Sequence, residues 1–419
     1  MRAGLEMEGS ERLSFNISEK GERRDMTGPL EGIRVIDFGR FIAAPYCAML
    51  FADMGADVIR VERREGGEDR YVGPVTENGE GGLYLNLNRN KRGMTLAPAH
   101  PLAREIINRL IASSDIVIAN LPPDVLERLG LDYKSICAVK EEIIMIQATA
   151  FGVDGPYRNR VGFDSVAQAM SGAMGLTGFP GPPIRDIVSF MDYGTALHAA
   201  FGAMVALYEK QRTGRGRFIE VSLLTTGVTF MMPLLAERSA NGILRTQQGN
   251  TGYYTAPNDV YKTSDGWIIV QTIGGPMFER WARLVGCEDL IGDSRFSDDI
   301  TRANNHDIIN RAMSDWCARL TRDEAIREIE GARIPCGPIY NLDEVLEDPQ
   351  VQARRLLEEI EYPGANGPLP LASTPVRLSE MSASIRRRAP TLGEHTDEVL
   401  AELGFSKGEI EEFHEARVV

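Results

Sequence analysis

The chain has 419 residues, of which 43% are hydrophobic and 25% charged. These proportions are typical of soluble globular proteins, and the length predicts two or three domains. The formal net charge of −14 argues against a nucleic-acid-binding protein. No apolar run reaches the roughly 18 residues that a membrane span requires, so we expect no membrane contact.

Cysteines and histidines are too scattered to predict a metal site or a disulfide framework. Neither C-x-x-C nor H-E-x-x-H spacing occurs. An odd number of dispersed cysteines is typical of reduced thiols, which favours a cytoplasmic location. The residues are Cys47, Cys137, Cys287, Cys317, Cys336, His100, His198, His306, His395 and His414.

The first 27 residues are polar and of mixed charge. They lack the apolar core of a signal peptide, and their acidic residues argue against a mitochondrial transit sequence. We expect a disordered tail or a vector- or annotation-derived extension, with Met26 as a plausible alternative start.

Short β-rich runs alternate with helical patterns through the first half of the chain. Strands are expected at 33–38, 56–62, 115–119, 143–148 and 218–223, and helices at 103–111, 125–129 and 133–139. The alternation predicts an α/β fold with a doubly wound parallel sheet and a ligand crevice at the carboxyl ends of its strands.

The usual phosphate-binding motifs of such a sheet are missing. No G-x-G-x-x-G follows the first strand, and no G-x-x-x-x-G-K-[ST] occurs. This disfavours dinucleotide-dependent hydride transfer and P-loop chemistry. Lys91 and Arg92 in NRNKRG are basic, but their residue types do not distinguish a surface from an anion site.

Asp192 is the leading candidate for a chemical role. It ends the apolar run IVSFMD and precedes Gly194-Thr195, where a helical pattern begins. An acid there is expected to cap the helix, whose amides and dipole would keep it ionised. A helix-capping role is enough to explain the local pattern, but the glycine-rich loops that precede Asp192 suit a ligand site.

The second half of the chain is organised differently. Residues 227–256 lack clear periodicity and are interpreted as a crossing linker. A smaller α+β region follows, with a strand at 267–272 and helices at 277–285, 305–317 and 322–330. Residues 344–388 look extended, and two helices, one opening in 391–400 and the other at 407–415, close the chain.

Eight stretches in order resemble the class III CoA-transferases, the family of formyl-CoA transferase, carnitine CoA-transferase and α-methylacyl-CoA racemase. They cover the chain from about Pro29 to Val419. The stretches are PLEGIRVIDF, GADVIRVERREGGED, LNRNKRG, DIVIANLPPDVLERLGL, AFGVDGPY, SFMDYGTALHAAFGAMVALYEKQRTGRGRFIEVSLL, RIPCGPIYNLDEVLEDPQV and APTLGEHTDEVLAELGFS.

The resemblance implies a Rossmann-like large domain (28–223) completed by C-terminal helices (389–419). A smaller α+β domain (257–343) lies between linkers 224–256 and 344–388. It also implies a homodimer in which two chains pass through each other as interlocked rings.

By resemblance, Asp192 is the nucleophile. Its carboxylate would attack an acyl-CoA thioester, and aspartyl anhydride and aspartyl-CoA thioester intermediates would follow. Backbone amides near the acid would stabilise the oxyanions. Family racemases pair this aspartate with a histidine in G-H-D, whereas this chain has Gly162-Phe163-Asp164. Phenylalanine cannot exchange a proton, so a racemase is the weaker alternative.

The resemblance also implies that CoA is bound by residues scattered along the chain. It implies that CoA or acyl-CoA is a substrate and that no cofactor is permanently bound. Arg40 lies in the loop that the family places beside the thioester. We therefore form the hypothesis that Arg40 binds an acceptor carboxylate. The implied CoA-binding residues are Arg40, Phe41, Ile42, Arg63, Leu96, Asn120 and Arg128.

Tyr84 and Gly252 are the expected substrate contacts. Tyr84, like Tyr157, Tyr253 and Tyr254, is equally compatible with packing. The stretch 249–254 stands where formyl-CoA transferase has a glycine lid, but it keeps only two glycines. The leading hypothesis is CoA transfer to a small carboxylic acid, with dicarboxylic acids favoured. An acyl-CoA racemase and a non-catalytic CoA-binding protein remain the alternatives.

Overall fold

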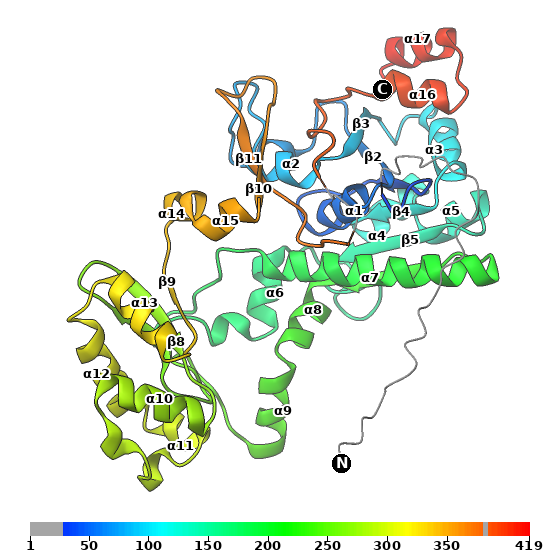
Figure 1. The fold of residues 1–419 in the computed structure, drawn as a ribbon. Helices are drawn as coiled ribbons and strands as arrows, with labels where there is room; N and C mark the ends of the chain where they lie inside the picture. The colour runs from blue at the N-terminus through cyan, green and yellow to red at the C-terminus, as the bar shows by residue number, and fades with distance from the viewer. Residues whose placement is uncertain (1–27, 380–383) are drawn as a thin grey trace, which may run out of the picture.

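The computed structural model describes residues 28–379 and 384–419, so the tail expected at 1–27 lies outside the described residues. A six-stranded parallel sheet in the order β3-β2-β1-β4-β5-β6 forms the centre of a mixed α/β fold (Figure 1). The predicted parallel α/β sheet is therefore confirmed. Its strands are β1 (Arg34–Asp37), β2 (Asp57–Glu62), β3 (Lys91–Thr95), β4 (Ile116–Ala119), β5 (Ile144–Thr149) and β6 (Phe218–Ser222).

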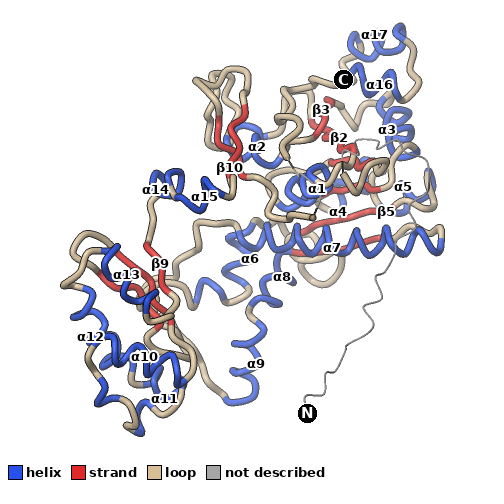
Figure 2. The backbone as a smooth tube through the Cα atoms, in the orientation of Figure 1, coloured by secondary structure: helices blue, strands red, loops and turns tan. Residues whose placement is uncertain are grey.

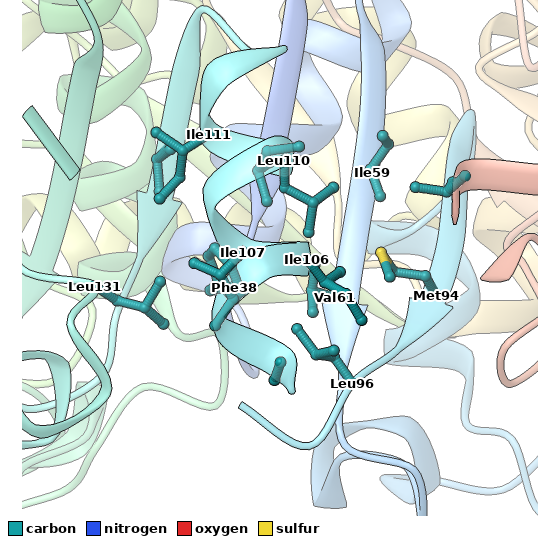
Figure 3. Close-up of a cluster of buried hydrophobic side chains, with 14 of the residues drawn as sticks. Phe38, Ile59, Val61, Met94, Leu96, Ile106, Ile107, Leu110, Ile111 and Leu131 are labelled. Carbon is teal, nitrogen blue, oxygen red and sulfur yellow. The ribbon is translucent and has the colours of Figure 1, made fainter. Parts of the chain in front are cut away.

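Helices cover both faces of this sheet because its strands are apolar on both sides. Ile36 of β1 packs into one buried cluster, shown in Figure 3, and Val35 packs into the other. The first cluster includes side chains of α3 (Ala103–Ala112), α4 (Pro123–Leu129), α5 (Tyr133–Val139), α16 (Thr396–Glu402) and α17 (Lys407–Glu415). The second includes α1 (Ala43–Asp53) and α7 (Phe190–Thr213). The C-terminal helices thus pack on a sheet that the N-terminal half builds.

Strand β3 has no counterpart among the strands expected from sequence. Its first residues, Lys91 and Arg92, are buried rather than solvated. Lys91 Nζ lies 2.8 Å from Asp37 Oδ2, and Arg92 Nη2 lies 2.7 Å from Asp57 Oδ2. Two cations enter a central sheet because carboxylates on β1 and β2 compensate their charge.

A second, antiparallel sheet of three strands lies in the separate lobe at the lower left of Figure 2. Its core surrounds the fully buried Trp281. The elements are β7 (Asn258–Lys262), β8 (Trp267–Gln271), β9 (Cys336–Pro338), α10 (Gly275–Val285), η3 (Glu288–Leu290), η4 (Ser294–Phe296), α11 (Asp299–Asn304), α12 (His306–Cys317) and α13 (Arg322–Gly331). The helices predicted in this region are confirmed.

The two segments interpreted as linkers contain regular elements. Residues 227–256 include helix rather than only irregular chain, because Ser222 caps one helix and a left-handed Gly242 ends the next. Their apolar residues are largely exposed, so no core-facing stripe marked them in the sequence. The helices are α8 (Leu223–Phe230) and α9 (Met232–Asn241). In the described part of 344–388 lie the end of α14 (Leu342–Glu347), α15 (Pro349–Ala353), β10 (Leu357–Ile360) and β11 (Leu369–Ala372).

Four short elements complete the large lobe: η1 (Glu68–Tyr71), α2 (Gly82–Leu87), α6 (Asp164–Met170) and η2 (Ala173–Gly175). Among the described residues, no helix is both long and apolar enough to cross a membrane.

Candidate active site

A cavity of ≈ 440 Å³ lies at the carboxyl edge of the central sheet. The loops after β1, β4 and β5 supply much of its wall, with Arg40, Asn120 and Phe151 as examples. Strand order reverses between β1 and β4, and open α/β sheets bind ligands at such a switch point. Asp192 lines the same cavity. The predicted crevice and the candidate acid therefore coincide.

Asp192 lies inside the first turn of α7, and the expected helix cap is wrong. The helix begins at Phe190, and Ser189 is its N-cap without a side-chain cap bond. Asp164 Oδ1 accepts hydrogen bonds from the backbone amides of Met191 (2.8 Å) and Asp192 (3.2 Å). Two of the first-turn amides are thus satisfied by an acid from α6. Those two amides are not available to stabilise an oxyanion.

The ionisation state expected for Asp192 is also wrong. Burial, with a smaller contribution from the negative charge of Asp164, raises the pKa of Asp192 to about 7. Both effects disfavour the charged carboxylate, and the local amide that would favour it points to Asp164. Asp192 therefore titrates near neutral pH, a property common among catalytic groups.

Asp164 is the contact residue of Asp192 that sequence reasoning missed. It is buried, and Gln168 donates from Nε2 to its Oδ2 at 2.5 Å. Gln168 Oε1 accepts from the amide of Asp186 at 2.9 Å. The segment that precedes α7 is therefore also held by the Asp164–Gln168 pair. The sequence marked Asp164 only as the end of G-F-D. The acid–amide spacing of i and i+4 on α6 was the available signal.

A smaller cavity of ≈ 210 Å³ adjoins the first, and Arg40 and Leu121 line both. Arg63 and Leu96 line the smaller one. Glu68 forms ion pairs with both Arg40 and Arg63, the latter at 2.6 Å. Burial and the charge of Arg63 lower the pKa of Arg40. The junction of the cavities is therefore a place where two guanidinium groups share one carboxylate.

The loop after β1 is held in a specific conformation. Asn120 Oδ1 accepts from the Arg40 amide at 2.8 Å, and Asn120 Nδ2 donates to the Arg40 carbonyl at 2.7 Å. Phe41 has a φ of 61°, in the left-handed region that non-glycine residues rarely adopt. Its ring packs edge-on against Phe163 at 5.4 Å. Asn120 thus positions the loop through the backbone.

Four expected site residues do not line either cavity. Ile42 is half-buried before α1, and Arg128 is exposed on α4, 3.6 Å from Asp124. Tyr84 is only 1% exposed, and its hydroxyl is bonded to Arg70 and the Pro390 carbonyl. A role for Tyr84 in packing rather than substrate contact follows from this burial.

Gly252 lies between α9 and β7, where its amide donates to the Asn258 carbonyl at 2.9 Å. A Cβ at Gly252 would lie 2.2 Å from Asn258 Nδ2, so a larger residue here would have to displace the Asn258 side chain. Gly249 of the same stretch donates to the Gly178 carbonyl. The stretch 249–254 thus contacts the 178 loop and does not line the described cavities.

Comparison with known proteins identifies the family of the chain. The family model described as CoA-transferase family III matches residues 30–396. The chain is 34% identical over 399 residues to the succinyl-CoA–L-malate CoA-transferase beta subunit of Chloroflexus aurantiacus, covering 94% of this chain and 98% of that one. It is 32% identical to the human succinyl-CoA:glutarate CoA-transferase, covering 90% and 86%.

A solved structure has the same fold. The crystal structure of a CAIB/BAIF family protein from Brucella suis superposes with a TM-score of 0.79 and 31% identity, covering 90% of this chain and 100% of that one. A match of the family model to most of the chain, together with relatives above 30% identity at nearly full length, shows that this protein belongs to CoA-transferase family III.

Proposed function

We propose that this protein transfers CoA from an acyl-CoA donor to a small dicarboxylic acid, with Asp192 as the nucleophile. The observation that carries the proposal is the position of Asp192 in a cavity at the switch point of the sheet, whose wall also contains three arginines. The relatives named for succinyl-CoA with malate or glutarate support this substrate class.

The proposed reaction consists of four reversible displacements at carbonyl carbon. Asp192 Oδ attacks the donor thioester, the C–S bond breaks, and CoA thiolate leaves an aspartyl–acyl anhydride. The thiolate attacks the aspartyl carbonyl and expels the donor carboxylate, which leaves an aspartyl-CoA thioester. The acceptor carboxylate displaces the thiolate, and the thiolate then attacks the acceptor carbonyl and restores Asp192. No net proton is taken up or released.

The two adjoining cavities suit the two ends of acyl-CoA. The thioester end would occupy the larger cavity with Asp192, Arg40 and Phe41, and the nucleotide end the smaller one with Arg63 and Leu96. Arg128 is adjacent in sequence to Leu129, which lines the smaller cavity, and would reach a phosphate from outside. Asn120 acts through the backbone of Arg40.

A homodimer is part of the proposal, supported by exposed apolar side chains on α7, α8 and α9. Patches of this kind commonly mark protein interfaces. Light scattering that gives the monomer mass of 46.3 kDa would contradict it. The proposal that the two chains of the dimer form interlocked rings rests on the family resemblance alone. The proposal that residues 249–254 act as a lid has the same basis. The exposed residues are Leu197, Phe201, Met204, Val205, Tyr208, Val228, Phe230, Met232 and Leu235.

We also propose a cytoplasmic location for the protein. All five cysteines are free thiols, which suits a reducing compartment.

Chemical trapping tests the nucleophile. The protein is incubated with succinyl-CoA, quenched with hydroxylamine or borohydride, and digested for mass spectrometry. Modification at Asp192 is expected. Absence of an adduct with retained exchange of the α-proton would favour the racemase alternative, for which Phe163 offers no proton-transfer group. Absence of both would favour a CoA-binding protein.

Arg40→Ala is expected to raise the KM for acyl-CoA about 10-fold or more, because a charge-assisted contact at the cavity junction is lost. Steady-state kinetics with donor and acceptor varied separately measure it. A rise in the acceptor KM alone would instead support the hypothesis that Arg40 binds the acceptor carboxylate. Unchanged values for both substrates would contradict either role.

Glu68→Gln is expected to lower the KM for acyl-CoA about 2- to 5-fold, since a ligand phosphate must otherwise displace the Glu68 carboxylate from Arg40 and Arg63. Glu65→Gln is the control, because it changes the net charge equally three residues away. Equal KM values for the two variants would show that only overall charge matters.

A further inference from the structure

Three arginines line the cavity around Asp192, and their partners differ. Arg40 pairs with Glu68, and Arg158 Nη2 lies 3.5 Å from Glu127 Oε1. Within 28–379 and 384–419, no carboxylate forms an ion pair with Arg160. Its guanidinium instead lies 4.5 Å from the centre of the Tyr157 ring and 6.0 Å from that of Phe151.

The loop that carries Arg160 returns tightly to the end of β5. The Arg160 amide donates to the Tyr157 carbonyl at 2.9 Å. A Cβ at Gly162 would lie 2.9 Å from the Ala150 Cβ and 3.2 Å from the Phe151 ring, so the backbone packs closely there. Arg160, which is exposed, is thereby kept at the rim of the cavity.

Stacking leaves the recognition edge of a guanidinium open. An arginine on an aromatic face keeps its N–H donors in the guanidinium plane, where carboxylates bind bidentately. Among the described residues, Asp192 is the only carboxylate lining this cavity, and most of the remaining wall is apolar. A second carboxylate brought in by a substrate would meet a cation without an acidic partner.

We propose that Arg160 binds the non-reacting carboxylate of a dicarboxylic acid while its other carboxylate reacts at Asp192. Arg160 is then a specificity-determining residue that favours dicarboxylic over monocarboxylic acids. The inference rests on the proposed function. Since donor acid and acceptor acid occupy the same cavity in turn, Arg160 serves both half-reactions.

The variants Arg160→Gln and Arg160→Lys test this role of Arg160 in the full-length protein. Succinyl-CoA is the donor, and the acceptor glutarate, named for a relative, is compared with pentanoate, which has a methyl group in place of the second carboxylate. In a ping-pong reaction kcat/KM for the acceptor reports only the acceptor half-reaction. Arg215→Gln, an exposed arginine beyond α7 that does not line the cavity, is the control.

For glutarate, kcat/KM is expected to fall about 10- to 100-fold in Arg160→Gln and less in Arg160→Lys. For pentanoate, kcat/KM should change less than about 3-fold, so the preference for glutarate over pentanoate is largely lost. Where pentanoate reacts too slowly, its inhibition constant against glutarate gives the same comparison.

Equal losses for both acids, or retained selectivity, would overturn the role of Arg160. Failure of the wild-type protein to label Asp192 or transfer CoA would instead overturn the proposed function. The two failures are thus separable.

Discussion

Asp192→Asn is expected to reduce CoA transfer by at least about 10³-fold, because an amide cannot form the anhydride. The same change should stabilise the folded protein above neutral pH. The pKa of Asp192 is about 7 in the folded chain and about 4 in an unfolded one. Protonation therefore favours folding, and this contribution is lost as the pH rises through about 7.

The stability effect is measured by thermal unfolding at pH 5 and pH 8. The variant should unfold several degrees above wild type at pH 8, since each pKa unit corresponds to about 1.4 kcal/mol and each kcal/mol to roughly 2–4 °C in a domain of this size. The gain should be smaller at pH 5. Asp307→Asn, an exposed acid on α12, is the control. A loss of stability at pH 8 would show that the ionised carboxylate makes favourable contacts.

Asp164→Asn is expected to move the acid limb of the pH–rate profile to lower pH. The asparagine oxygen still accepts the Met191 and Asp192 amides, whereas the negative charge that helps to raise the pKa of Asp192 is gone. Because burial is the larger cause, the midpoint should shift down from about 7 by only about 0.5–1 unit. The measurement is kcat/KM from pH 5 to 9.

Asp164→Ala separates charge from geometry. This substitution removes both the negative charge and the accepting oxygen. It leaves the amides of Met191 and Asp192 without an acceptor, which should lower the free energy of unfolding by about 1–3 kcal/mol. We expect it to lower kcat and stability together, whereas Asp164→Asn mainly displaces the profile. An unshifted midpoint in Asp164→Asn would mean that Asp164 does not influence the ionisation of Asp192.

The sequence by itself was sufficient for most of the central sheet. The runs that became β1, β2, β4, β5 and β6 are short, β-branched and bounded by turn residues, so local pattern and burial agreed. Strand β3 escaped prediction because Lys91 and Arg92 look solvated until Asp37 and Asp57 are placed beside them, 54 and 35 residues away.

The site also combines features that the sequence predicted with features that only the folded chain determines. Asp192 stood out by local pattern and by the family resemblance, and Arg40 and Asn120 were assigned to the site by the resemblance alone. The three residues lie together in the structure, where loops after parallel strands converge at one edge of the sheet. Sequence reasoning could not predict the ionisation of Asp192 or the burial of Tyr84. Ionisation depends on desolvation and on Asp164, whose carboxylate lies 28 residues earlier and reaches the first turn of α7 only in the folded chain. Local pattern thus determined where the acid lies, and tertiary packing decided its charge.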